Sequence, residues 1–161
     1  MSVEAGQAQH GHFAITAYTP SHLSPEVFYT ANGGQQWNEA TPSMPNTGGQ
    51  IVSANEVGAG YTTSGQLLLT WRGYYQQAGA FDTFAAMLDG SNFGPVVTVS
   101  PEPSVYPPLI YLGNYDPSTG GGDFTTWITG NSRDAFVAFP YSPDALAEDT
   151  FFATIPLSAL H

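Results

Sequence analysis

The chain has 161 residues, no cysteine and a formal net charge of −11, because thirteen carboxylates face two basic residues, Arg72 and Arg133. The lack of cysteine excludes a disulfide framework, a thiolate nucleophile and a zinc–thiolate site. A surface this acidic repels phosphate backbones, and no apolar run approaches the ~20 residues that cross a bilayer, so we expect no nucleic-acid partner and no membrane insertion.

The length suits one compact domain. We expect an N-terminal extension over residues 1–11, followed by a single β domain over residues 12–161. The N-terminal segment shows no charged region followed by an apolar region, so no secretory signal is visible. The location stays open, and an extracellular or surface-exposed one is favoured because an acidic, cysteine-free, turn-rich domain suits exposure.

Aromatic residues make up 14% of the chain, with 18 Gly and 13 Pro, which favours many short strands joined by tight turns. Three stretches share one plan: an apolar strand ends at an aromatic residue, a polar loop follows, and a second strand comes next. The first strands are predicted at residues 13–18, 67–71 and 124–127, and the second strands at 26–30, 82–86 and 149–154. In the third stretch the predicted loop is longer and runs through Pro140 to Glu148.

These stretches repeat at a regular distance. The aromatic ends of the first strands, Tyr18, Trp71 and Trp127, lie 53 and 56 positions apart, near the ~40–50 residues of a propeller blade. The sequence therefore predicts an all-β fold of antiparallel sheets, a partial β-propeller of about three blades over residues 12–49, 50–102 and 103–161. A β-sandwich or jelly roll is the alternative, since about eight to ten short strands would also fit.

One predicted turn carries a recognisable motif. The segment Thr30-Ala-Asn32-Gly-Gly34-Gln-Gln-Trp37 resembles the Asp-box, Ser/Thr-x-Asp-x-Gly-x-Thr-Trp/Phe, with Asn32 in place of the aspartate. In such a turn the side chain at the Asx position accepts backbone N–H bonds and glycine supplies positive φ. We expect the terminal aromatic to pack between strands.

Two further segments extend the likeness. Asp89-Gly90-Ser-Asn-Phe93 is similar to a shortened Asp-box, with four positions instead of five from aspartate to aromatic. The closing stretch, made of residues 111–115, 124–133 and 149–155, resembles the end of an Asp-box propeller, with Asn114 replacing an aspartate. Over residues 12–155 the chain thus resembles the sialidase-like β-propellers built from Asp-box (BNR) repeats.

This resemblance implies an incomplete ring. Such propellers usually have six or more blades, so about three blades leave the terminal sheets without neighbours. Exposed apolar sheet faces and edges associate. We therefore expect self-association, or a second chain that completes the propeller.

The resemblance also sets a test for catalysis. Sialidases hold the substrate carboxylate with three arginines and use a Tyr/Glu nucleophile pair with an aspartic acid/base. This chain has two arginines, so we assign no catalytic residue, and the question of an enzyme stays open and leans to no. The candidate ligand-binding set, whose aromatic members could stack on sugar rings or equally serve as core, is Trp71, Arg72, Tyr74, Tyr75, Tyr115, Trp127 and Arg133.

A metal site is the weaker possibility. Asp116 and Asp123 flank a glycine-rich loop whose oxygens could bind calcium, but the regular Asx spacing of a dedicated calcium loop is missing, and a plain turn explains the segment as well. We expect no other cofactor.

The leading functional hypothesis is a non-catalytic binding or assembly module that presents loops to a glycan or protein partner, or packs with other copies. One alternative is a fragment of an exo-sialidase-like glycoside hydrolase. A second is a structural surface component of a virion or cell envelope.

Overall fold

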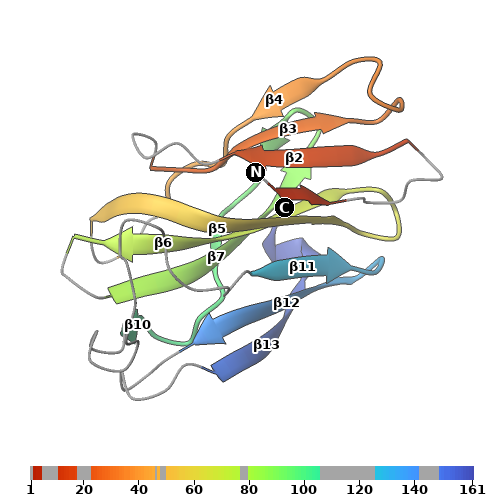
Figure 1. Cartoon of the computed structure of the whole chain (residues 1–161). Coiled ribbons are helices and arrows are strands. Elements are labelled where there is room, and N and C mark those ends of the chain that lie inside the picture. Colours follow the sequence, from red (N-terminus) through yellow and green to blue (C-terminus); the bar gives the residue numbers. More distant parts are fainter. Residues whose placement is uncertain are drawn as a thin grey trace.

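A computed structural model describes residues 2–4, 11–17, 23–45, 47, 50–76, 80–105, 126–141 and 149–161. Within these ranges the fold is all-β, with three antiparallel sheets and one short 3-10 helix (Figure 1). No helix in the described ranges is long and apolar enough to span a membrane. The all-β, antiparallel prediction is confirmed.

The N-terminal sheet has the strand order β1-β2-β3-β4. Its strands are β1 (Ser2–Glu4), β2 (Phe13–Ala17), β3 (Glu26–Thr30) and β4 (Asn38–Ala40). Strand β1, which lies within the segment interpreted as an extension, pairs antiparallel with β2. The side chains of β2 alternate between buried and half-buried, the pattern of a strand with one covered face.

The central sheet has the strand order β10-β7-β6-β5. Its long strands are β5 (Ile51–Tyr61), β6 (Leu67–Tyr75) and β7 (Ala80–Asp89), and the short strands β8 (Asn92–Phe93), β9 (Val97–Thr98) and β10 (Ser104–Val105) all pair with β7. Nearly every described side chain of β6 and β7 is buried. Both faces of this sheet are therefore covered, which explains the continuous apolar runs in its sequence.

The C-terminal sheet has the strand order β11-β12-β13. Its strands are β11 (Trp127–Gly130), β12 (Asp134–Tyr141) and β13 (Asp149–Pro156), and the 3-10 helix η4 (Leu157–Ala159) follows. Two sequence predictions change here. The third predicted loop contains strand β12, because the alternating residues Ala135, Val137 and Phe139 bury one face of the segment against the core. The predicted strand at 124–127 reaches the described residues only at its end, and β11 starts at Trp127.

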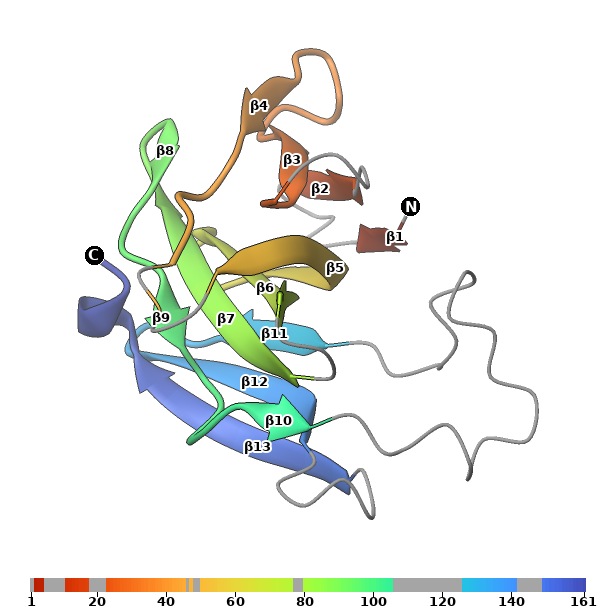
Figure 2. The same ribbon diagram turned by 90° about the vertical axis from the view of Figure 1, so that its left-hand side faces the viewer.

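The three sheets are stacked as layers, with the central sheet in the middle (Figure 2). One apolar core, containing Val27, Leu69, Trp71 and Phe84, joins the N-terminal sheet to the central sheet. A second core, containing Leu68, Met87, Val137 and Phe139, joins the central sheet to the C-terminal sheet. Consecutive residues of β6 thus point into different cores, as the two-residue period of a strand requires.

Glycines let the C-terminal sheet approach the central one. A Cβ placed on Gly58 would lie 2.2 Å from the carbonyl oxygen of Thr126, and one on Gly60 would lie 2.0 Å from that of Ile128. The edge of β11, which is bridged to Thr62 at Gly130, therefore rests on β5 at two positions that have no side chain. This contact covers an edge strand that would otherwise expose unpaired backbone groups.

The three sheets are formed by consecutive parts of the chain. Strands β2–β4 lie within residues 12–49, β5–β9 within 50–102, and β11–β13 within 103–161. Strand β10 lies in the third range by sequence, yet it pairs with β7 of the central sheet.

Candidate functional site

Arg72 lies in a buried ion pair at the end of the central sheet. Its side chain is 1% exposed, and its Nε lies 2.8 Å from Oε2 of Glu56. Opposite charges at this distance in a buried site attract strongly. The guanidinium carbon also lies 4.5 Å from the centre of the Phe81 ring, a cation–π contact.

Glu56 reaches this position through an irregular backbone. Its φ of 51° is unusual for a residue other than glycine, and it lies where the pairing of β5 with β6 shifts register between Asn55 and Gly58. Bulges of this kind turn a side chain to a new direction. The hydroxyl of Tyr74 donates to Oε1 of Glu56 at 3.3 Å, and the hydroxyl of Thr126 donates to the Glu56 carbonyl at 2.6 Å.

A second polar cluster surrounds Asp82 on β7. Tyr75 and Ser100 donate to its two carboxylate oxygens at 2.5 Å and 2.6 Å, and Ser100 accepts the backbone N–H of Thr83 at 3.1 Å. Burial raises the pKa of Tyr75 to about 12, and the hydrogen bond to Asp82 adds to this shift. The Tyr75 hydroxyl therefore keeps its proton well above neutral pH.

Tyr141 and Tyr61 behave in the same way. Burial, followed by the hydrogen bond that Tyr141 donates to Glu102 at 3.0 Å, raises the pKa of Tyr141. Burial, with a smaller effect from Tyr29, raises the pKa of Tyr61 to about 12. In both residues burial disfavours the charged phenolate.

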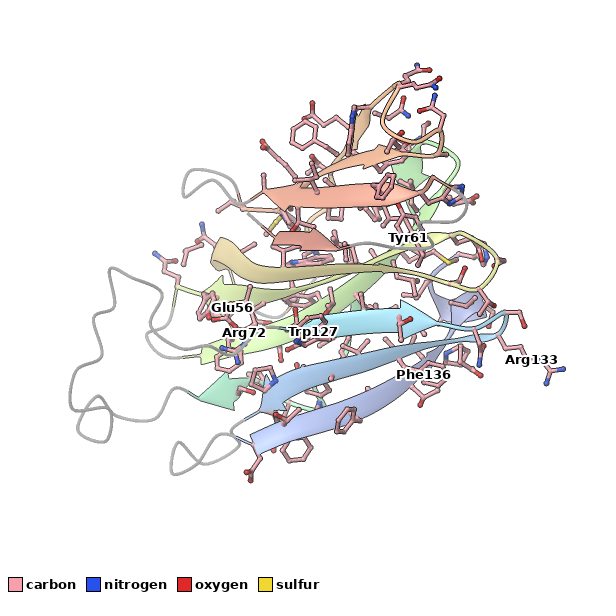
Figure 3. All side chains as sticks on the ribbon, turned by 45° about the vertical axis from the view of Figure 1, so that its right-hand side comes forward. Glu56, Tyr61, Arg72, Trp127, Arg133 and Phe136 are labelled. Atoms are coloured by element: carbon pink, nitrogen blue, oxygen red, sulfur yellow. The ribbon has the colours of Figure 1, made fainter. Side chains whose placement is uncertain are left out.

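The structure separates the predicted ligand-binding residues. Trp71 is fully buried in the core between the N-terminal and central sheets. Arg72 and Arg133 lie at opposite ends of the molecule (Figure 3). Tyr74 and Tyr75 bond to different carboxylates. Tyr115, Asp116 and Asp123 lie outside the described residues, so the predicted calcium loop stays a prediction.

The two motif turns differ. In the β3–β4 turn, the Thr30 hydroxyl accepts the N–H of Gly34 at 3.1 Å and Oδ1 of Asn32 accepts the N–H of Gln36 at 3.0 Å, while Gly34 has a φ of 86°. Trp37, expected between strands, is 42% exposed. In the β7–β8 turn Gly90 has a φ of 64°, Asp89 pairs with Asn92 and Leu88 pairs with Phe93. The Asp89 carboxylate is exposed, 4.0 Å from Nδ1 of His161.

The outer face of the C-terminal sheet carries a cluster of exposed aromatic side chains. Trp127 is 59% exposed, Phe136 41% and Phe152 82%. Trp127 pairs with Ala138, which pairs with Phe152, so the small Ala138 forms the floor between two aromatic rings. We call Trp127, Phe136 and Phe152 the outer patch. A shallow groove of about 210 Å³ runs along it, lined by these residues with Ile128, Thr129, Val137 and Ala138.

Only Trp127 of this patch was predicted from the sequence, while Phe136, Phe152 and the Arg72 partner Glu56 were missed. The adjacent residues Phe151 and Phe152 could have indicated an aromatic on the outer face, since two consecutive residues of a strand point to opposite faces. Glu56 carries no such signal, because it meets Arg72 through an irregular turn of the backbone.

The chain was compared with known protein families, with characterised proteins and with solved structures. None of the three comparisons gives a match, so the functional argument depends on the residues of the chain itself.

Proposed function

We propose that the chain is a non-catalytic assembly module of sialidase-like propeller type, which binds a protein partner through the outer patch. The observation that carries the proposal is the exposure of Trp127, Phe136 and Phe152 on one sheet face. Large exposed apolar patches on monomers mark interaction sites. A terminal propeller blade without its neighbour would present such a face.

The chemistry of the patch favours a protein over a glycan. Among the side chains that line the groove, only the Thr129 hydroxyl and the indole N–H of Trp127 can form hydrogen bonds. A sugar ring stacked on Trp127 or Phe152 would leave most of its hydroxyls without protein partners, and burying unpaired polar groups costs free energy. The apolar face of another β-sheet has no such requirement.

The polar clusters support the non-catalytic part of the proposal. Arg72 is buried beside Glu56, and Arg133 lies at the opposite end of the molecule (Figure 3). The two arginines therefore cannot hold one substrate carboxylate together. The hydroxyl of Tyr74 donates to Glu56, which is the kind of contact a Tyr/Glu nucleophile pair makes, but the arginine beside this pair is 1% exposed and already faces Glu56.

The test uses a fluorescent dye that binds exposed apolar surface, added to dilute, monomeric protein. We expect Phe152→Ser and Trp127→Ser to remove most of the dye signal, while the matched control Trp37→Ser, also an exposed tryptophan but on the β3–β4 turn, leaves it unchanged. Equal losses from all three variants would refute the assignment of the patch.

The non-catalytic part has its own measurement. Incubation with a chromogenic sialic acid glycoside should release product no faster than buffer alone. Hydrolysis that Tyr74→Phe abolishes, in protein that still folds, would overturn this part and favour the glycoside hydrolase alternative.

A further inference from the structure

The N-terminal sheet offers a second apolar face at the other end of the stack. Ala14, Val27 and Ala40 point into the core, so their strand neighbours point the opposite way. Ile15 pairs with Phe28, and Phe28 pairs with Glu39, which makes one row across β2, β3 and β4. The half-buried side chains of Phe13, Ile15 and Phe28, with the exposed Glu39 at one end, form what we call the N-terminal face.

Charge distinguishes these two faces. Both basic residues of the sequence are described: Arg72 is buried, so Arg133 is the one exposed lysine or arginine side chain in a chain of net charge −11. Arg133 lies in the turn between β11 and β12, just before the strand that carries Phe136 (Figure 3). The N-terminal face ends instead at Glu39, which is exposed. The outer patch therefore has the exposed Arg133 at its rim, next to the half-buried Asp134, whereas the N-terminal face carries two carboxylates, the half-buried Glu26 and the exposed Glu39.

From this complementarity we propose that copies of the chain associate head to tail. The outer patch of one copy packs on the N-terminal face of the next, and Arg133 of the first copy lies beside Glu39 of the second. The inference rests on the proposed function and names the partner as another copy of the same chain. Two different faces make a heterologous contact, which produces closed rings or open filaments and no symmetric pair.

The layering inside one copy supports this geometry. The central sheet already receives the N-terminal sheet on one face and the C-terminal sheet on the other, through apolar cores. Head-to-tail contact continues the same stack, with a C-terminal sheet followed by an N-terminal sheet. Sheets packed face to face lie about 10 Å apart, a spacing that aromatic and branched side chains fill.

The first experiment measures mass by light scattering over a range of concentrations at fixed, moderate salt. We expect mass above the 17.1 kDa of one chain. Arg133→Glu and Glu39→Arg should each raise the dissociation constant about fivefold or more, because each places like charges together at the rim. The double variant, with both charges reversed, should recover wild-type association to within about twofold.

A second experiment tests the heterologous geometry. Phe152→Asp disables the outer patch and Phe28→Asp disables the N-terminal face, so neither variant alone should associate. An equimolar mixture should form dimers and nothing larger, because each pair retains one intact contact. Circular dichroism of each variant confirms that it is folded.

Several outcomes would overturn the inference. They are a wild-type chain that stays monomeric at every concentration, charge reversals with no effect, or a mixture that fails to dimerise. If the dye still reports the outer patch in that case, the proposed function stands and the partner is a different protein. If the dye signal is also independent of the patch, both proposals fail.

Discussion

At the scale of single residues, Arg72, a candidate ligand-binding residue, lies in a buried ion pair that stabilises the fold. A guanidinium taken out of water costs several kcal/mol unless a carboxylate is placed beside it. Glu56 supplies that carboxylate at 2.8 Å, at the expense of a positive φ. An arginine buried in this way is out of reach of a ligand at the surface.

Removing the guanidinium alone should destabilise the chain strongly. Arg72→Met leaves the Glu56 carboxylate without its buried counterion, and we expect the free energy of unfolding to fall by about 3 kcal/mol. Urea unfolding of dilute protein measures this loss. The matched control is Arg133→Met, an exposed arginine, which should change stability by less than about 0.5 kcal/mol. Similar losses in both variants would contradict a structural role for Arg72.

The pKa of Tyr75 predicts how stability depends on alkaline pH. Its pKa is raised from 10.0 to about 12 in the folded chain, so ionisation favours the unfolded state. The stabilisation is fully present below about pH 10 and is lost as the pH rises from about 10 to about 12. Urea unfolding across this window should show falling stability, with a shallower slope in Tyr75→Phe than in wild type. An unchanged slope would show that the hydroxyl titrates normally.

At the scale of elements, the joint between β5 and β11 decides how the layers fit. The carbonyl oxygens of Thr126 and Ile128 occupy the space that side chains on Gly58 and Gly60 would need. Backbone has little freedom to retreat from such a contact. The position of the whole C-terminal sheet, and of the outer patch on it, therefore depends on having glycine at these two positions.

Gly60→Ala should loosen this joint. The new methyl would lie 2.0 Å from the Ile128 carbonyl oxygen, and we expect the free energy of unfolding to fall by at least about 2 kcal/mol. Gly33→Ala is the matched control, because it makes the same chemical change at a φ of 71° with no atom within 4 Å. It should cost about 1 kcal/mol through backbone strain alone. Equal losses would mean that close approach contributes nothing.

At the scale of the whole molecule, charge opposes the compact state. Thirteen carboxylates and two arginines leave strong self-repulsion with few favourable pairs to offset it. Burial of two apolar cores must exceed this cost. The repulsion also acts between copies, so an apolar face such as the outer patch suits close contact better than a face rich in carboxylates.

Adding a small amount of salt should therefore stabilise the chain, because it screens the repulsion among the carboxylates. Between about 0.01 and 0.15 M NaCl the screening length falls from about 30 to about 8 Å. We expect the urea midpoint to rise over this range, because repulsion among the carboxylates weakens. Effects of salt on apolar burial need much higher concentrations, which separates the two causes. A flat midpoint would show that the carboxylates are too far apart to repel.

The local pattern of the sequence determined the all-β class and several strands. Strand β3 has the predicted bounds, and β6, β7 and β13 contain the predicted segments, because apolar and aromatic runs and their flanking turn residues act over a few neighbours. Strand β5 gave no such signal. Its residues Gly58 and Gly60 are typical of turns, and only the backbone of β11 resting on them explains their place in a strand.

The candidate site depended on tertiary structure to a greater degree. From the sequence, Trp71 and Trp127 have the same context, each closing an apolar run, yet one is buried between two sheets and the other is exposed on an outer face. Which face of a strand receives a covering layer depends on residues far away in the chain. The sequence by itself determined that the chain has two arginines, which excludes a carboxylate site built from three. The stacking of the sheets decided which aromatics face solvent, because burial is a property of neighbours in space.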